Sequence, residues 1–402
     1  MSGTDAGQTD RSFVAILRVF TKLGLTSFGG PIAHLGYFRD EFVVRRKWLD
    51  DAAYADLVAL CQFLPGPASS QAGFAIGLMR GGWRGAAAAW LGFTLPSALA
   101  LVLFAYGARL AGGAAWDGLL HGLKVVAVAV IAQAVWGMAR TLAPDRTRAT
   151  IALAAALLVL FVPSAFGQVG AIVLGGLAGL ALCRDTPAPA ATHLPVSVSR
   201  STGVAALVLF FALLFLLPLA AAASQGQAVA YFDAFYRAGA LVFGGGHVVL
   251  PLLQAEVAPP GWIGKDAFLA GYGAAQAVPG PLFTFAAYLG AIMAPPPNGP
   301  AGAALCLVAI FLPGLLLVAG SLPFWNAFRA RPQAQAALRG TNAAVVGILG
   351  AALYTPVWTS AITRPADFGL ALAAFVLLTV WKAPPWIVVA FTALGGIAAA
   401  IV

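Results

Sequence analysis

A repeated helix break constrains this chain more than any other feature of its sequence. The segment Gln62-Phe63-Leu64-Pro65-Gly66-Pro67 returns far downstream as Gln276-Ala277-Val278-Pro279-Gly280-Pro281. Each copy lies inside a long apolar segment, and a proline cannot donate the backbone hydrogen bond that a continuous helix needs. The sequence therefore predicts two apolar segments whose helices break at equivalent places.

The repeat extends well beyond these two breaks. Matching residues recur in the same order with small changes in spacing: Phe28-Gly29-Gly30 with Phe243-Gly244-Gly245, Glu41 with Glu256, Trp48 with Trp262, and Leu95-Pro96 with Leu312-Pro313. Such order over most of a chain indicates one ancestral unit present in two copies. We therefore expect two structural repeats, each with two broken helices.

The composition indicates whether these repeats lie in water or in a membrane. Apolar residues make up 61% of the chain and charged residues only 9%, with a mean hydropathy of +0.89. A soluble domain carries far more charge, so we predict an all-α polytopic membrane protein. The formal charge of +9 then reports orientation in the bilayer rather than a nucleic-acid partner. The three cysteines have no metal-ligand spacing, and we expect neither a metal nor a cofactor.

Basic residues predict which ends of the helices face the cytoplasm. Residues 45–47 and 80–84 carry basic clusters on both sides of the first Pro-Gly-Pro, whereas the matching residues 259–265 and 295–300 carry little charge. The broken helices of the first half are therefore expected to enter and leave on the cytoplasmic side as hairpins, and those of the second half on the other side. Irregular backbone at such depth is tolerated only where protein or a water-filled cavity covers it.

The expected elements follow in order along the chain. Hairpins are predicted at 12–44, 49–80, 229–257 and 264–294, and spans at 85–108, 117–140, 149–166, 168–183, 203–223, 302–322, 338–359, 367–381 and 386–402. The span at 203–223 has no counterpart and inverts the second copy. The resulting units are a cytoplasmic tail 1–11, a first repeat 12–183, a cytoplasmic linker 184–200, an unpaired linking helix 201–228 and an inverted repeat 229–402. Inverted repeats with broken helices at mid-membrane are typical of secondary transporters.

The breaks form the predicted binding site. A half-helix that begins inside the membrane points free N–H groups and a partial positive charge toward a cavity, which suits an oxyanion. Such half-helices would begin at 67–73 and 281–287, with hydroxyl donors from Ser69, Ser70 and Thr284. The rest of the predicted lining is Gln62, Pro65, Gly66, Pro67, Phe28, Gly29 and Gly30, with Gln276, Pro279, Gly280, Pro281, Phe243, Gly244 and Gly245 in the second copy. The glutamines could instead bond to carbonyls freed by the breaks, and the glycines could simply allow close packing.

Ionisable side chains of the first copy are candidates for handling charge. Arg39 lies in the return arm of the first hairpin, where an arginine needs either an anion or a partner such as Asp40 or Glu41. Asp56, Glu41 and His34 are the candidates for carrying a coupling proton. A solvated Glu41 and a hydrogen-bonded interior His34 are the simpler interpretations of those two residues.

Phe28-Gly29-Gly30-Pro31 and the stretch Gln62 to Pro67, with their degenerate second copies, resemble the two-domain chromate ion transporter family. The resemblance covers roughly residues 12–402. It implies a bacterial inner-membrane protein that moves chromate, outward and driven by the proton gradient, and so confers chromate resistance. Members of the family are often described with about thirteen transmembrane segments, whereas the hairpins above leave nine crossings.

Several alternatives remain open at the level of the sequence. Chromate and sulfate have the same charge and shape, so a sulfate-type importer of the same fold is the nearest rival. A passive channel would not need two broken hairpins in each half. An intramembrane enzyme would need paired carboxylates or a Ser/His set at one depth, and we predict that the protein is not an enzyme. The expected partners are chromate or sulfate, protons and the lipid bilayer. A second copy of the chain, in a homodimer, is a further candidate partner.

Overall fold

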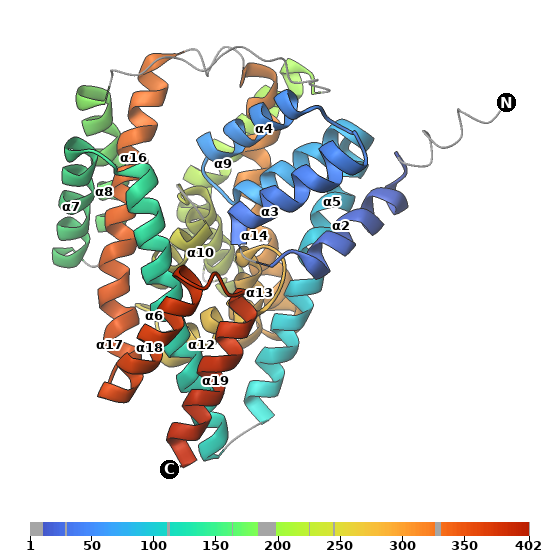
Figure 1. Cartoon of the computed structure of the whole chain (residues 1–402). Helices are drawn as coiled ribbons and strands as arrows, with labels where there is room; N and C mark the ends of the chain where they lie inside the picture. The colour runs from blue at the N-terminus through green and yellow to red at the C-terminus, as the bar shows by residue number, and fades with distance from the viewer. Residues whose placement is uncertain are drawn as a thin grey trace.

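The computed structural model describes residues 11–28, 30–110, 113–162, 164–183, 198–224, 226–243, 246–325 and 331–401. These residues form helices and connecting segments without a strand (Figure 1). The all-helical class predicted from the sequence is therefore confirmed. Gly29, Gly244 and Gly245, residues 1–10 of the predicted tail and residues 184–197 of the predicted linker lie outside the described residues.

The helices follow the two repeats in order. The first half contains α2 (Phe13–Thr26), α3 (Gly30–Arg39), the π-helical η1 (Asp40–Arg45), α4 (Asp51–Phe63), α5 (Ala68–Leu110), α6 (Ala114–Leu142), α7 (Arg146–Phe161) and α8 (Ala165–Leu182). After α9 (Arg200–Ala223), the second half contains α10 (Gln227–Ala240), η2 (Gly246–Val248), α11 (Val249–Val257), α12 (Lys265–Ala277), η3 (Leu282–Thr284), α13 (Phe285–Ile292), α14 (Gly299–Ser321), η4 (Leu322–Phe324), α16 (Pro332–Ala352), η5 (Leu353–Trp358), α17 (Thr359–Ala361), α18 (Pro365–Thr379) and α19 (Pro385–Ile401). Phe28, Phe243 and both Pro-Gly-Pro segments lie between helices, and Gly30 begins α3.

The first broken helix of each half folds back on itself. In the first half, the Phe20 ring of α2 stacks on Phe42 of η1 at a centroid distance of 5.0 Å. In the second half, Arg237 of α10 reaches Glu256 of α11, with Nη1 and Oε1 2.7 Å apart. Residues on opposite sides of each break therefore touch, which is the hairpin that the sequence predicted.

A sharp bend separates the return arm of the second hairpin from the following span. The long helix α5 leaves helical geometry at Gly81 and Gly82, where Gly82 has a φ of 60°. A side chain at Gly77 would collide with the backbone of Gly85, so the two arms of α5 lie against each other beyond the bend. Gly290 and Gly302 make the same contact in the second half. Glycine is needed at both crossings because any β-carbon would hold the backbones apart.

The second half runs in the opposite direction to the first. In Figure 1, α6 rises from the lower end of α5, whereas its counterpart α16 descends toward α17. Likewise α8 ends at the top of the view, while its counterpart α19 ends at the C-terminus at the bottom. The inversion follows from the one unpaired helix, α9, that lies between the halves.

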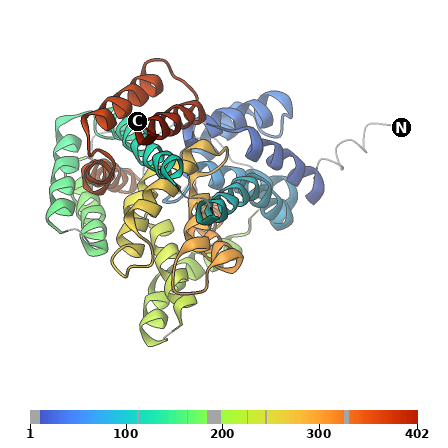
Figure 2. The ribbon, with the colours of Figure 1, turned by 90° about the horizontal axis from the view of Figure 1, so that it is seen from below.

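The two halves interlock rather than sit apart. Gly122 of α6 packs against the backbone of Thr392 in α19, and Gly340 of α16 packs against the backbone of Gly175 in α8. Each half therefore contributes a central helix that binds the last helix of the other half. Seen from below, α7 and α8 in green lie far from the blue helices α2–α4, with second-half helices between them (Figure 2).

Helix length and polarity agree with a membrane-spanning protein. Among the described residues, 5 helical segments are long and apolar enough to cross a membrane: 68–107, 114–142, 200–223, 299–324 and 332–361. Residues 166–182, 365–379 and 385–401 are shorter apolar helices. A helix of about 17 residues rises about 25 Å, somewhat less than the ~30 Å hydrocarbon core. The helix α9 is mostly exposed and apolar, as at Phe211 and Phe215, and presents a lipid-facing surface.

Candidate substrate site

Two reciprocal hydrogen bonds join the breaks of the two halves. The Gly66 N–H donates to the Val242 carbonyl at 2.7 Å, and the Gly280 N–H donates to the Ser27 carbonyl at 2.9 Å. Gly66 and Gly280 are the central residues of the two Pro-Gly-Pro segments, and Ser27 and Val242 precede the two Phe-Gly-Gly segments. Each half therefore inserts its second break beside the first break of the other half.

The glycines at these junctions have a backbone that other residues rarely adopt. Gly66 and Gly280 have φ values of 123° and 100°. A β-carbon on Gly66 would lie 3.1 Å from the Cα of Gly314, and one on Gly280 would lie 2.6 Å from the Ser97 hydroxyl. Gly314 in α14 and Ser97 in α5 follow the matching prolines Pro313 and Pro96, so the packing is symmetric as well. The Pro-Gly-Pro segments are thus both helix breaks and contact points between the halves.

In the first half, the starts of two half-helices lie together. His34, one turn into α3, has its Nδ1 3.3 Å from the Ser69 hydroxyl in the first turn of α5. Both side chains are buried, with exposed fractions of 1% and 2%. The His34 ring also interacts with the Ser27 main chain and packs edge-on to Phe93 at 5.3 Å. The N-terminal ends of α3 and α5, with their partial positive charges, therefore meet beside the Ser27 junction.

Buried polar atoms without partners surround this meeting point. Among the described residues, the hydroxyls of Ser27, Ser70 and Thr94 and the Gln71 Oε1 make no hydrogen bond. Their residues are almost completely buried, at 3% exposed or less. Such groups are uncommon in folded proteins because their desolvation is uncompensated. Three unpartnered hydroxyls beside two helix N-termini can donate to an anion.

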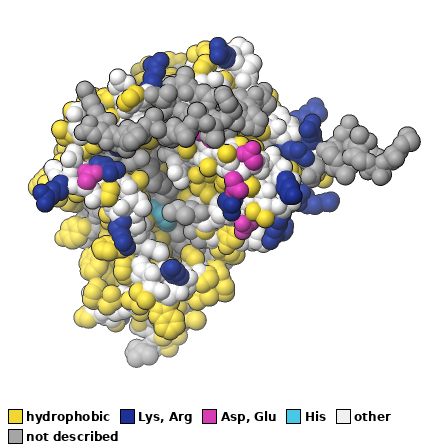
Figure 3. Space-filling view, turned by 45° about the horizontal axis from the view of Figure 1, so that its top comes forward, with side chains coloured by type: hydrophobic (Ala, Val, Ile, Leu, Met, Phe, Trp, Pro, Cys, Tyr) yellow, Lys and Arg dark blue, Asp and Glu magenta, His cyan; other side chains and the backbone are white. Residues whose placement is uncertain are grey.

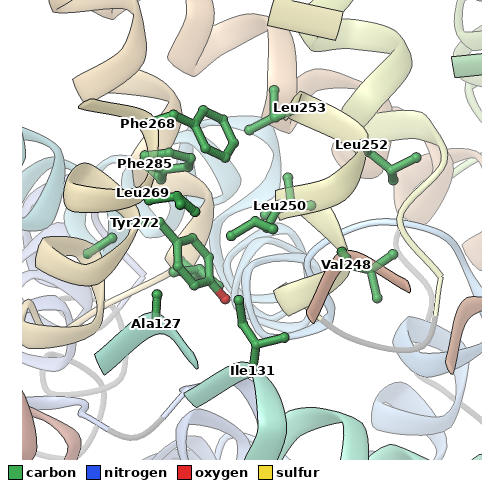
Figure 4. Packing of buried hydrophobic residues seen from close by; sticks show 14 of the residues in the cluster. Ala127, Ile131, Val248, Leu250, Leu252, Leu253, Phe268, Leu269, Tyr272 and Phe285 are labelled. Atoms are coloured by element: carbon green, nitrogen blue, oxygen red, sulfur yellow. The ribbon is translucent and has the colours of Figure 1, made fainter. Parts of the chain in front are cut away.

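The second half is closed by aromatic packing instead. The Thr284 hydroxyl, which matches Ser70, already donates to the Pro281 carbonyl at 2.8 Å. His247 Nδ1 lies 2.8 Å from the Tyr272 hydroxyl. Phe268, Phe285 and Tyr272 pack with the aliphatic residues of α6 and α11 (Figure 4). The two halves therefore have the same backbone arrangement at their breaks, but the side chains there are polar in the first half and largely aromatic in the second.

The two glutamines of the repeat differ from their sequence interpretation. Gln62 is exposed, so the hypothesis that it bonds to a carbonyl freed by the break is wrong. Gln71 does this instead, since its Nε2 donates to the Pro65 carbonyl at 2.9 Å and to the Gly314 carbonyl at 3.1 Å. Gln276 is half-buried, and its Nε2 has no hydrogen-bond partner among the described residues. The repeat did not point to Gln71, because Phe285 stands at the matching place in the second half.

Phe28 and Phe243, the aromatic residues before the paired glycines, are half-buried. Phe28 lies 6.4 Å from the Trp386 ring of α19, measured between ring centroids. Gly30 begins α3 with a φ of 78°, and a β-carbon there would meet no other atom within 4 Å. The glycine at 30 therefore serves the turn into α3 rather than close packing.

Arg39 is paired differently from the sequence hypothesis. Its guanidinium binds Asp51 at the start of α4, with Nη2 and Oδ1 2.7 Å apart, rather than Asp40 or Glu41. The Arg39 side chain is 50% exposed, which places it at the surface. The fold-back of α4 beside α3 brings Asp51 within reach, and that neighbour could not be read from the local sequence.

Glu41 is buried, so the interpretation of a solvated glutamate is wrong. Its carboxylate lies 2.8 Å from Arg46 Nε, 3.6 Å from Arg45 and 3.8 Å from Lys22. In the second half, Arg237 binds Glu256 and also Asp233, with Nη2 and Oδ2 2.9 Å apart. The two ion-pair groups occupy equivalent places, a correspondence that aligning Lys22 with Arg237 would have revealed.

Asp56 joins the first half to the second. Its side chain is buried, and the indole N–H of Trp325 donates to Oδ1 at 2.9 Å. Trp325 follows α14 and η4 and also packs edge-on to Phe63 at 5.6 Å. The acid near the first break is therefore held by the end of a second-half helix.

A cavity of about 600 Å³ lies between α6, α12 and α13. Lys124 and Asp266 pair across it, with Nζ and Oδ1 3.0 Å apart. His121, also in its lining, has Nε2 2.9 Å from Asp367 Oδ1. Within the described part of the chain, no three His, Cys, Asp or Glu side chains are grouped to hold a metal ion.

Inverted repeats whose broken helices pair at their centre, in an apolar all-helical chain, define a membrane transporter. The sequence profile of the chromate transporter family matches residues 14–180 and 229–397, one copy in each half. The chain belongs to the chromate transporter family, and the resemblance inferred from its motifs is confirmed.

Curated relatives cover most of the chain. It is 29% identical to a chromate transport protein of Pseudomonas aeruginosa over 98% of this chain and 93% of that protein. It is 28% identical to a probable chromate transport protein of Synechococcus elongatus over 85% of this chain and 84% of the relative. A chromate transport protein of Cupriavidus metallidurans is 25% identical over 91% and 88%, respectively. No solved structure gives a significant match.

Proposed function

We propose that this protein exports chromate across the bacterial inner membrane, driven by the proton gradient, and thereby confers chromate resistance. Three relatives that cover most of the chain are named for chromate transport. The observation that carries the proposal is the meeting of two half-helix starts, α3 and α5, beside buried hydroxyls that have no partner in the described residues. Such a place favours a tetrahedral oxyanion over a cation.

The anion would be bound by the first turns of α3 and α5. Free N–H groups there and the hydroxyls of Ser27, Ser69 and Ser70 supply donors that a dianion accepts. Hydrogen bonds to a charged group contribute roughly 1.5–3 kcal/mol each where water is excluded. The site needs no embedded cation, which agrees with the surface position of Arg39 and its bond to Asp51. We therefore leave Arg39 out of the proposed binding site.

Transport would follow from the pseudo-symmetry of the two halves. If each half can adopt the arrangement of the other, the two halves would exchange conformations around the bound anion. The binding site would then open to one side of the membrane at a time. The reciprocal bonds of Gly66 and Gly280 are the contacts about which such an exchange would occur. Asp56, Glu41 and His34 remain the candidates for the coupling proton, and Asp56 is favoured because it is hydrogen-bonded to Trp325 of the second half.

The orientation and division of the chain belong to the same proposal. We propose a cytoplasmic N-terminus and linker, with residues 12–183 and 229–402 as the two inverted repeats joined through 201–228. The direction of the relevant helices in Figure 1 supports this division. A homodimer is compatible with the exposed apolar face of α9.

Flux measurements in proteoliposomes test the function directly. Purified protein should drive chromate flux that increases when a proton gradient is imposed and collapses when the gradient is dissipated. Sulfate flux at equal concentration distinguishes the rival oxyanion importer, since a sulfate transporter would favour sulfate and move it inward. Flux of either anion that ignores the gradient would indicate a passive channel and contradict the proposal.

A further inference from the structure

The outer face of α2 carries an open groove of about 500 Å³. The described residues that line it all belong to α2, and they combine aliphatic side chains with two basic ones: Val14, Leu17, Arg18, Thr21, Lys22, Leu25 and Thr26. Val14 and Leu25 are 61% and 56% exposed. The opposite face of α2 packs on α5, where Gly24 meets the backbone of Gly92. This outer face is therefore available to the surroundings of the protein.

The basic residues of the groove are poorly neutralised by protein. Lys22 is 3.8 Å from Glu41, but Arg46 at 2.8 Å and Arg45 at 3.6 Å share that same carboxylate. Arg18, one turn before Lys22, forms no ion pair within the described residues. Figure 3 shows several basic side chains gathered at one side of the molecule. The region around Arg18, Lys22 and Glu41 in the first hairpin thus carries more basic than acidic side chains.

The equivalent place in the second half is neutralised internally. Arg18 corresponds to Asp233, and Lys22 to Arg237. Asp233 and Glu256 hold the Arg237 guanidinium from two sides, at 2.9 Å and 2.7 Å. In the second half, the acids of this hairpin therefore neutralise its arginine. The first half differs because it has Arg18 where the second half has Asp233.

We propose that the outer face of α2 binds an anionic phospholipid, with its phosphate between Arg18 and Lys22 and its acyl chains along Val14, Leu17 and Leu25. A basic side chain is attracted to an anionic membrane surface, and an unpaired cation beside hydrocarbon is costly. A free oxyanion would satisfy the charges but gains nothing from the aliphatic residues, which favours a lipid. The lipid would hold α2 against α5 and so steady the hairpin that carries Ser27.

Native mass spectrometry of the purified protein tests this site. Wild-type protein in neutral detergent is titrated with dioleoyl phosphatidylglycerol or with dioleoyl phosphatidylcholine, which has the same chains and no net charge. We expect the wild type to retain phosphatidylglycerol preferentially. Arg18→Asp, which copies the charge arrangement of the second half, should weaken this retention roughly tenfold or more. Leu17→Ser with Leu25→Ser should also weaken it without changing the charge.

Control measurements make each outcome decisive. Arg140→Gln with Arg146→Gln removes two exposed basic residues elsewhere and should retain the lipid like wild type. Equal retention by Arg18→Asp and wild type would overturn the proposal, as would displacement of the lipid by millimolar glycerol 1-phosphate or chromate. If Arg18→Asp does not fold, a photoactivatable phosphatidylglycerol on wild-type protein decides the matter. It should label the peptide 11–39, and labelling confined to other helices would refute the site.

Discussion

At the scale of single residues, the two halves differ in what their equivalent hydroxyls do. Ser70 has no hydrogen-bond partner among the described residues, while its counterpart Thr284 donates to the Pro281 carbonyl. Ser69 contacts His34, whereas the second half has Phe283 at that place. We therefore expect the first half to dominate recognition of the anion, while the second half supplies apolar packing.

We predict that Ser69→Ala with Ser70→Ala weakens chromate affinity by roughly 1–3 kcal/mol, because two donors to the anion are lost. Thr284→Val, the matched change in the second half, should leave affinity nearly unchanged because its hydroxyl is already used by Pro281. Binding to purified variants in detergent measures both. Equal losses in the two variants would mean that the first half does not dominate recognition.

Asp56 gives a second prediction at this scale. Asp56→Asn should abolish gradient-driven flux while leaving chromate binding intact, since the amide oxygen can still accept a hydrogen bond from Trp325 but the amide cannot take up and release a proton. Trp325→Phe removes that bond and should reduce coupled flux only in part. Chromate exchange without a gradient serves as the control for folding. A well-expressed Asp56→Asn protein with unchanged pH dependence would remove Asp56 from the mechanism.

At the scale of the helices, each Pro-Gly-Pro break both ends a helix and contacts the other half of the molecule. Pro65 and Pro279 end their helices, and the following glycines reach across to the other half. The freed carbonyl of Pro65 accepts a hydrogen bond from the Gln71 Nε2. A helix that continued through either break would remove the reciprocal bonds.

Gly66→Ala and Gly280→Ala should therefore both destabilise the protein. The positive φ alone costs about 1–2 kcal/mol for a residue with a β-carbon, and the collisions with Gly314 or Ser97 add to it. Gly137→Ala is the matched control, because Gly137 lies in α6 with no atom within 4 Å of an added β-carbon. Thermal unfolding in detergent should show lower Tm for the first two and an unchanged or higher Tm for the control. A wild-type Tm for Gly66→Ala would contradict the prediction that glycine is needed where the first break contacts the second half.

At the scale of the whole molecule, pseudo-symmetry explains the arrangement of both halves. The same contacts occur twice, at Gly66 and Gly280, at Gly77 and Gly290, and in the packing of Gly122 and Gly340. The copies differ in the polar breaks and the basic α2 face of the first half and in the aromatic core of the second, and we expect these differences to reflect separate roles.

Inversion predicts opposite exposure of equivalent loops. Single cysteines at Lys47 and Asn298, in a chain whose three native cysteines are replaced, should react with a membrane-impermeant reagent from opposite sides. Cys61 and Cys306 are buried, so their replacement by alanine leaves the surface unchanged. Intact and inverted vesicles provide the comparison. Labelling of both positions from one side would rule out the inverted topology.

The sequence by itself determined the membrane environment, the duplication and the places of the four breaks. These properties follow from hydropathy and from the missing N–H of proline, which act locally and need no knowledge of spatial neighbours. The repeat also predicted that Pro65-Gly66-Pro67 and Pro279-Gly280-Pro281 would have equivalent places in the two halves. Inversion could be predicted because a single unpaired apolar helix changes the side on which the second copy begins.

Only the tertiary structure decided which side chains meet at those places. Gln71 rather than Gln62 satisfies the first break, Arg39 binds Asp51, and Trp325 reaches Asp56 across most of the chain. A hydrogen bond depends on a separation of about 3 Å, and the relative rotation of packed helices sets that distance. That rotation is fixed by close contacts such as Gly122 with Thr392 and Gly340 with Gly175, which depend on the combined shape of both halves rather than on any one segment.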